Sequence, residues 1–198
     1  MKTLQHIATI VVLSFFFTAC FGDKNTIIGQ DLGDTNFVNK NFNGNKKEFA
    51  SLPKNMCEFI TEAKVKELYP DATQILFDDG QTFATKSCRF LVYTNENTDS
   101  KYDFLSGTIF AVEDKLAEGE NWIETWELRK KMSKSAEFIS GFGQAAIWTG
   151  KKRELAVKMD GYIITINVPG SPFNKEELAK KRDYKSIALE IAKSTGLF

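Results

Sequence analysis

The stretch 154-ELAVKMDGYIITINV-168 decides the fold of this chain. Two runs of alternating side chains flank Asp160 and Gly161, and an Asp-Gly pair favours a tight hairpin turn because both residues tolerate positive φ. Alternation with a period of two is typical of β-strands, whose successive side chains point to opposite faces of a sheet. The stretch therefore predicts an antiparallel hairpin with strands over 154–159 and 162–168.

Four further runs are rich in β-branched and aromatic residues and extend this sheet. They predict strands over 73–77, 87–94, 105–112 and 145–149. The first three form one meander, and the fourth joins the hairpin in a second meander. In the run 87–94, Cys88 shares a face with other apolar side chains, which marks the side of the strand that faces the core.

Helical patterns stand before, between and after the two meanders. Thr61 is a candidate N-cap for a helix of about two turns, which Pro70 ends. Asn174, with Glu177 three residues later, forms a variant of the capping box and begins the last helix, which Gly196 ends. The apolar stripe of that helix comprises Leu178, Tyr184, Ile187, Ala188, Ile191 and Ala192.

The segment 115–135 predicts the middle helix. Its acids come first and its bases last, an order that suits the helix dipole. Trp122 and Trp126 lie one turn apart and form an aromatic stripe. This stripe fits either a helix packed on a sheet or the wall of a ligand cleft, and packing is the more common use of buried tryptophan.

These elements predict an α+β fold in which the antiparallel sheet is built from two three-stranded meanders and the helices pack on one face. Residues 51–198 would form a single domain, because about 145 residues suffice to bury one core.

The N-terminal segment has the three parts of a secretory signal. Lys2 supplies the positive charge, and the run from Ile7 to Phe17 is apolar apart from two residues. The run is too short to span a bilayer comfortably as a permanent helix. Residues 1–19 are therefore predicted to be a signal peptide. The alternative is an uncleaved anchor helix.

The residues Phe17, Thr18, Ala19 and Cys20 resemble the lipobox of bacterial lipoproteins, with Phe17 in place of the usual Leu. The resemblance implies that Cys20 becomes the N-terminus and carries acyl chains such as palmitate, whose combined burial anchors a protein in a membrane. A plain signal peptide without acylation is the alternative. Phe21 replaces the Asp that resembles an inner-membrane retention signal in Gram-negative bacteria, so the resemblance implies the outer membrane there.

Residues 20–50 are rich in glycine, asparagine and charge, and their scattered apolar residues cannot offset the entropy of ordering. They are predicted to form a flexible tether. The alternative is that Ile27 and Ile28, or Phe37 and Val38, add a short edge strand to the domain.

Cys57 and Cys88 are the other two cysteines. In an exported chain, a lone pair of cysteines is most simply a disulfide bond. Two buried free thiols, or a redox pair, are the alternatives, although catalytic dithiols usually occur as CxxC.

The body of the chain resembles small periplasmic lipoprotein domains that are uncharacterised or sensor-like. The resemblance covers roughly residues 55–195 and implies fold and location rather than chemistry. It rests on Cys57, Cys88, Gly141, Gly143, Ala145, Ala146, Asp160 and Gly161.

Several kinds of chemistry are disfavoured. His6 is the one histidine and lies in the predicted signal, so the mature chain would lack the imidazole of a catalytic triad and the usual zinc ligands. No cofactor is expected, because the chain has no phosphate-binding loop and its GxG precedes a strand. Asp78 with Asp79, or Asp160, could act as acid and base, but Asp78 and Asp79 would point to opposite faces of a strand, and a turn at Gly80 explains them without chemistry.

The mature chain would carry 25 basic and 26 acidic residues, a net charge of −1, which gives no indication of nucleic-acid binding. Two hypotheses remain. The domain is a non-catalytic binding or interaction module of the cell envelope, whose partner is another envelope protein or peptidoglycan. Alternatively, it is a carrier or sensor of an apolar ligand such as a lipid.

Overall fold

The computed structural model describes residues 35–78, 86–94, 104–114, 122–171 and 173–198. Residues Asp34–Phe198 form one compact unit, and all that follows concerns this unit. The predicted signal peptide, Cys20 and residues 21–34 lie outside the described residues. Among the helices that the structure describes, none has the length and apolar character needed to cross a bilayer.

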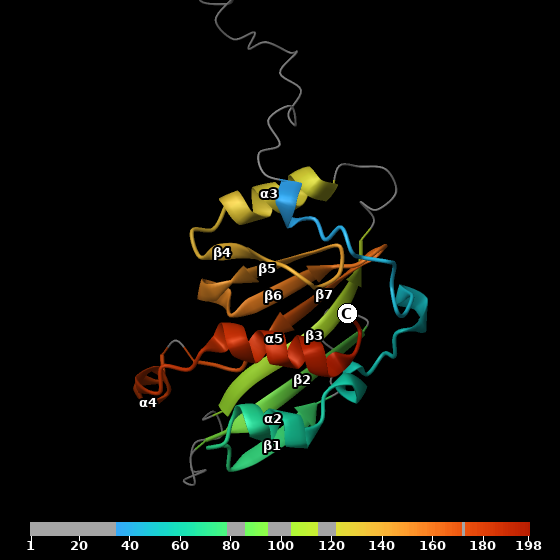
Figure 1. The fold of residues 1–198 in the computed structure, drawn as a ribbon. Coiled ribbons are helices and arrows are strands. Elements are labelled where there is room, and N and C mark those ends of the chain that lie inside the picture. The colour runs from blue at the N-terminus through green and yellow to red at the C-terminus, as the bar shows by residue number, and fades with distance from the viewer. Residues whose placement is uncertain (1–34, 79–85, 95–103, 115–121, 172) are drawn as a thin grey trace, which may run out of the picture. The chain divides into compact units, whose positions relative to one another are not determined.

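A seven-stranded antiparallel sheet forms the centre of the unit (Figure 1). Its order is β1-β2-β3-β7-β6-β5-β4, so two meanders meet where β3 pairs with β7. The predicted α+β class and the antiparallel sheet are confirmed. The strands are β1 (Gln74–Asp78), β2 (Lys86–Tyr93), β3 (Phe104–Glu113), β4 (Ala136–Ile139), β5 (Ala145–Thr149), β6 (Glu154–Lys158) and β7 (Tyr162–Asn167).

The hairpin between β6 and β7 forms where the Asp-Gly pair predicted it. The Met159 N–H donates to the Tyr162 carbonyl oxygen at 2.8 Å, which closes the turn. Gly161 adopts φ +76, a conformation in which a Cβ atom would be strained. This turn fixes the register in which Lys158 faces Ile163.

The sequence did not reveal β4. The predicted middle helix was expected to run to about residue 135, but α3 (Trp122–Lys131) ends earlier and a turn leads directly into β4. A strand of four residues is too short for alternation to be recognised, and only its pairing with β5, Ile139 to Ala146 at one end, defines it. The second meander therefore has four strands.

The predicted helix caps are confirmed. Thr61 Oγ1 accepts a hydrogen bond from the Lys64 N–H, and α2 (Glu62–Leu68) follows. The last helix is divided in two, however. Asn174 caps a short helix, α4 (Lys175–Ala179), and Asp183 caps α5 (Tyr184–Thr195), which Gly196 ends in the left-handed conformation.

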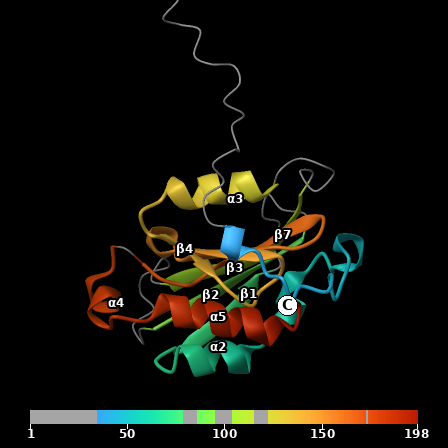
Figure 2. The same cartoon turned by 45° about the horizontal axis from the view of Figure 1, so that its top comes forward.

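The helices cover both faces of the sheet, which differs from the expectation that they pack on one face. α2 and α5 pack on one face, whereas α3 packs on the other (Figure 2). The reason is visible in β5, where every residue is buried: Ala146 and Trp148 join the core beneath α5, and Ala145 and Ile147 join a second core beneath Trp126 of α3. The stripe of tryptophans thus packs on the sheet.

Residues 35–50 pack on the domain, which differs from the tether expected up to residue 50. The Asn39 N–H donates to the Gln144 carbonyl oxygen at 2.8 Å, and the Tyr162 hydroxyl donates to the Lys47 carbonyl oxygen at 2.7 Å. Composition did not indicate this, because the few aromatic residues of the segment, such as Phe49, pack against residues far away in the sequence. Residues 35–50 therefore belong to the domain.

Candidate functional site

The predicted disulfide bond is present. Cys57 and Cys88 are bonded at an S–S distance of 2.09 Å. Cys88 lies in β2 on the same buried face as Phe90 and Val92, as the alternation predicted. The bond attaches the 3-10 helix Met56–Phe59 to the core side of the sheet, so its role is structural.

The structure does not bring the candidate acids together. Asp78 lies in β1, with Oδ2 at 3.9 Å from Arg89 Nη1. Asp160 lies in the turn after β6, where its N–H donates to Asn45 Oδ1. Three strands separate β1 from β6 in the sheet. Asp79 lies outside the described residues.

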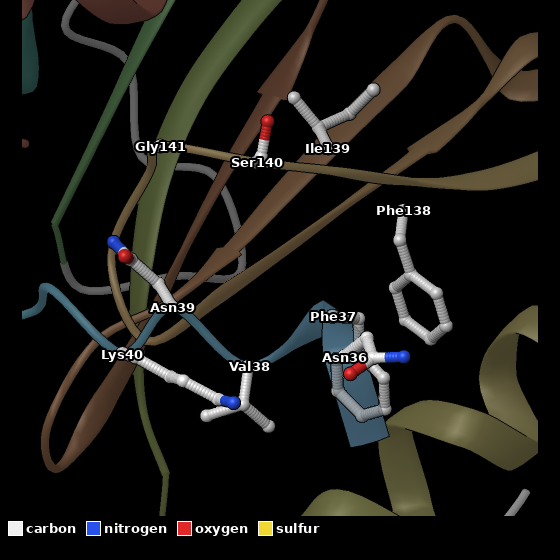
Figure 3. A pocket seen from close by; sticks show the side chains of 9 residues that line it. All are labelled: Asn36, Phe37, Val38, Asn39, Lys40, Phe138, Ile139, Ser140 and Gly141. Carbon is white, nitrogen blue, oxygen red and sulfur yellow. The ribbon is translucent and has the colours of Figure 1, made fainter. Parts of the chain in front are cut away.

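A hollow of about 370 Å³ lies between the end of the edge strand β4 and residues 36–40, which pack beside it (Figure 3). Small-molecule and peptide sites commonly begin at this size. We call this hollow the edge slot. It is lined by Asn36, Phe37, Val38, Asn39, Lys40, Phe138, Ile139, Ser140 and Gly141.

An aromatic pair forms the apolar wall of the edge slot. The rings of Phe37 and Phe138 stack with centroids 4.0 Å apart and an interplanar angle of 6°. The ring of Trp122 meets Phe37 edge-on at 6.4 Å, and Lys130 Nζ lies 5.8 Å from the centroid of the Phe138 ring. The wall is therefore supported by Trp122 and Lys130 of α3.

The opposite wall is held by Asn39. Its Nδ2 donates to the Gly143 carbonyl oxygen at 2.9 Å, and its Oδ1 accepts from the Asn41 N–H. Gly143 has φ +52, and a Cβ there would lie 2.3 Å from the Lys158 carbonyl oxygen, so the turn after β4 requires glycine. Asn39 thus attaches the segment of residues 36–40 to the turn that follows β4.

The N–H and C=O groups of Phe138 point away from β5, toward the open edge of β4. The Gly150 N–H donates to the Ser135 carbonyl oxygen, which makes these two residues a hydrogen-bonded pair in the antiparallel ladder. Such pairs alternate along a ladder, so Glu137 and Ile139 bond β5 whereas the N–H and C=O of Phe138 face away from it. Among the described residues, no backbone group pairs with them.

Lys40 is the one charged residue among the nine that line the edge slot. The slot thus combines a backbone donor and acceptor with which no described residue pairs, an aromatic wall and a cation. These groups can recognise an extended peptide that carries an acidic side chain or a carboxylate.

A second polar centre lies around Glu177, whose side chain is 1% exposed. Its Oε1 accepts from Arg182 Nε at 2.6 Å and from the Tyr184 hydroxyl at 3.0 Å. Arg182 also bonds Asp71 Oδ2 and lies over the ring of Tyr69, 4.9 Å from its centroid. We call these five residues the α4 clamp.

The clamp shifts the pKa of its members. Burial, together with the hydrogen bond to Glu177, raises the pKa of Tyr184 to about 12. Burial raises the pKa of Tyr69 well above its usual range. Burial would also raise the pKa of Asp71, but hydrogen bonds from Arg182 and Lys180 outweigh it and hold that pKa at about 2. Asp71 is therefore ionised, and Tyr184 neutral, at neutral pH.

Lys158 is a third buried charge, with a side chain that is 1% exposed. Its Nζ lies 3.0 Å from Asp114 Oδ2, donates to the Met159 carbonyl oxygen at 2.7 Å and lies 5.6 Å from the centroid of the Trp122 ring. A lysine in an alternating strand normally faces water, but α3 covers this face of β6. Asp114 therefore compensates the charge of Lys158, which is buried beside Trp122 of α3.

Comparison of the chain with protein-family models, with curated proteins and with solved structures finds no match. Within the ranges that the structure describes, no three histidine, cysteine or acidic side chains are grouped to hold a metal ion. The geometry of the edge slot and of the α4 clamp is thus the basis for assigning a function.

Proposed function

We propose that the protein is a membrane-anchored lipoprotein of the cell envelope whose domain is a non-catalytic interaction module. The domain binds an extended segment of an envelope protein along β4. The observation that carries this proposal is the outward N–H and C=O of Phe138 beside the edge slot. Edge strands with free backbone groups are templates for the addition of a further strand.

The edge slot would specify the added segment. A new strand lies about 4.8 Å from β4, and its backbone pairs with Phe138. Its side chains alternate between the two faces, so every second one meets the Phe37 and Phe138 rings. Lys40 favours an acidic residue next to that apolar position, and Glu137 and its partner Lys185 line the opposite face.

The membrane anchor would be the acylated Cys20, after removal of residues 1–19. Residues 20–34 then link the lipid to the domain, and a chain of this length spans at most about 50 Å. The proposed location is the outer membrane if the source is Gram-negative. An anchored module meets membrane-associated partners at a high effective concentration, which compensates for a modest affinity of the slot.

The alternative, a carrier of an apolar ligand, has less support. Such a carrier needs a hollow inside its core. Phe90, Ile109 and Ile164 instead belong to one main core cluster, and all three are fully buried. The edge slot lies outside that core and exposes peptide groups of β4. Native mass spectrometry of the protein purified from the envelope tests the alternative, which predicts a co-purifying lipid.

A photo-crosslinking amino acid at Ser140 tests the interaction module. Ser140 lines the slot and is exposed. We expect crosslinks in cells to one contiguous segment of an envelope protein, and a synthetic peptide of that segment should bind the purified chain. Phe138→Pro should abolish the binding because it removes the outward N–H, and Lys40→Gln should weaken it.

Phe138→Ala is the matched control, because it removes the ring but keeps the N–H. If both Phe138 variants bind the peptide equally well, strand addition is excluded. If no segment crosslinks to position 140, the slot is not the interaction site. Incorporation of labelled palmitate into the wild type but not into Cys20→Ser tests the anchor independently.

A further inference from the structure

Two apolar side chains stand in water on the outer side of α3. Leu128 is 56% exposed and Met132 is 80% exposed. The Met132 N–H donates to the Leu128 carbonyl oxygen at 2.9 Å, so the two lie one helical turn apart, away from the buried Trp126. Single exposed apolar side chains are normal on protein surfaces, so the meaning of these two depends on their surroundings.

Five exposed lysines lie at the end of α3 and in the turn beside it. The turn between β5 and β6 contacts the segment that follows α3. The Lys151 N–H donates to Ser135 Oγ at 3.2 Å, and the Gly150 N–H donates to the Ser135 carbonyl oxygen at 2.9 Å. Charges from two parts of the chain therefore meet at one end of α3. We call these lysines the α3 patch: Lys130, Lys131, Lys134, Lys151 and Lys152.

The positive charge of the α3 patch has few acidic partners. Lys131 is paired with Glu127 at 3.2 Å. Within the ranges that the structure describes, no acid forms an ion pair with the other four lysines. Glu124, a further acid of α3, lies in the first turn, at the other end of the helix. The neighbouring acids are engaged in the pairs Glu154 with Arg129 and Glu137 with Lys185.

The chain enters the domain beside α3. The described residues begin at Thr35, and Phe37 packs edge-on against Trp122 of α3 with ring centroids 6.4 Å apart. Figures 1 and 2 both show this first segment against α3. The link of residues 20–34 therefore joins the domain on the side of α3. It need not pass round the domain for α3 to meet a bilayer.

The other pair of exposed apolar side chains, at α4, has no such surroundings. Phe173 is 90% exposed and Leu178 is 53% exposed. Leu178 was expected in the buried stripe of the last helix, but the division of that helix into α4 and α5 turns it outward. Charges there are balanced, because Lys180 is paired with acids and the exposed Glu176 and Asp183 offset the remaining lysines. This region therefore serves as a control surface.

We propose that the α3 patch seats the domain on an anionic lipid surface, with Leu128 and Met132 in the headgroup layer and the lysines beside lipid phosphates. Exposed apolar side chains beside several lysines on a helix are typical of helices at a membrane interface. The inference rests on the proposed membrane anchor. That anchor makes the bilayer the anionic surface within reach of α3, which favours lipid over an acidic protein.

Seating on α3 also places the partner of the edge slot. Trp122 and Lys130 of α3 support the aromatic wall of the slot, so the slot would lie close to the lipid surface. The segment that adds to β4 would then belong to the part of an envelope protein nearest the membrane.

Tryptophan substitution in the full chain measures the seating. The protein is reconstituted in vesicles of phosphatidylethanolamine and phosphatidylglycerol whose acyl chains are brominated near the headgroups, which quenches nearby tryptophan. Met132→Trp should add a quenched component to the fluorescence. Phe173→Trp is the matched control, because it is equally exposed but lies beside α4, and its added component should not be quenched. Equal quenching of the two variants would overturn the proposal.

Charge variants made together with Met132→Trp test the lysines. Lys134→Gln or Lys151→Gln should each lower the ratio of seated to unseated domain by about fivefold. Lys175→Gln, which removes an exposed lysine of α4, should leave the ratio unchanged. Replacing the lipids with phosphatidylcholine should abolish the quenching. Quenching that is as strong in phosphatidylcholine would overturn the proposal.

Labelled palmitate separates the seating from the anchor. Quenching of Met132→Trp in a chain that takes up no palmitate would refute the acylation of Cys20 alone. Palmitate uptake without quenching would refute the seating alone. Phe138→Pro should leave the quenching unchanged, so the strand-addition test and this one fail independently. An acidic protein that crosslinks to the α3 patch in the absence of quenching would assign the patch to that protein and overturn the lipid contact.

Discussion

Arg182 Nε lies 2.6 Å from Oε1 of Glu177, and this ion pair is the centre of the α4 clamp. A buried carboxylate without its cation is strongly unfavourable, whereas the net gain from burying such a pair is small. The clamp therefore contributes position rather than net stability: it attaches α4 to Asp71, in the segment that follows α2.

Arg182→Met should destabilise the domain by about 1 to 3 kcal/mol, because the buried Glu177 would lose its nearest cation and two hydrogen bonds and would keep Lys180 Nζ at 3.4 Å. The free energy of unfolding is measured by urea titration at neutral pH. Lys193→Ala, which breaks the exposed pair with Glu190 at 2.8 Å, is the control and should cost less than about 1 kcal/mol. A small loss in Arg182→Met would show that Glu177 is not buried as described.

Asp71 should make the domain sensitive to acid. Its folded-state pKa, about 2, is below its ordinary value of 3.8, so the stabilisation is complete above the ordinary pKa and is lost as pH falls toward about 2. The side chain is 34% exposed, which limits the effect to the order of 1 kcal/mol. Asp71→Asn should lower the unfolding free energy at neutral pH and flatten its decline in this window.

The glycine in the turn after β4 should tolerate no side chain. Gly143→Ala places a Cβ 2.3 Å from a backbone oxygen at positive φ, and we expect a loss of about 3 kcal/mol or more. Gly161→Ala is the matched comparison, since its φ is +76 but its Cβ would meet nothing within 4 Å. It should cost about 1 kcal/mol by thermal denaturation. Equal losses would contradict the close contact at Gly143.

Loss of the disulfide bond should destabilise the domain without changing its fold. The bond closes a loop with a sequence separation of 31, which corresponds to about 3 to 4 kcal/mol. The Cys57→Ala, Cys88→Ala double variant should therefore unfold at a lower urea concentration, and dithiothreitol should shift the wild type but not the variant. A wild type that does not respond to reductant under denaturing titration would contradict this.

Local chemistry explains which elements could be predicted from the sequence. The turn at Asp160 and Gly161, the Thr61 cap and the Cys57 to Cys88 bond each depend on residue types whose preferences hold in almost any context. Alternation, together with runs of β-branched and aromatic residues, located six of the seven strands. β4 was missed because four residues give no periodicity.

Contacts between distant residues explain the rest. Asp71 and Arg182 are 111 positions apart, and nothing in the sequence distinguishes them from surface charges. The edge slot was equally hidden, because Phe37 meets Phe138 only after residues 35–50 pack on the sheet. The burial of Lys158 could not be predicted either, because alternation places it on the face opposite Leu155 and Val157, and only the packing of α3 covers that face.

The joining of the two meanders sets the order in which a newly made chain can mature. Thr108 of β3 receives a hydrogen bond from Asn167 Nδ2 of β7, 59 positions later, at 2.9 Å. Until the ribosome has delivered Asn167, the inner edge of β3 has no partner and remains open to other unfinished chains. The sheet therefore cannot be completed before the C-terminal quarter of the chain is made. A chain truncated before the last hairpin would expose the edge of β3 and would be prone to aggregation.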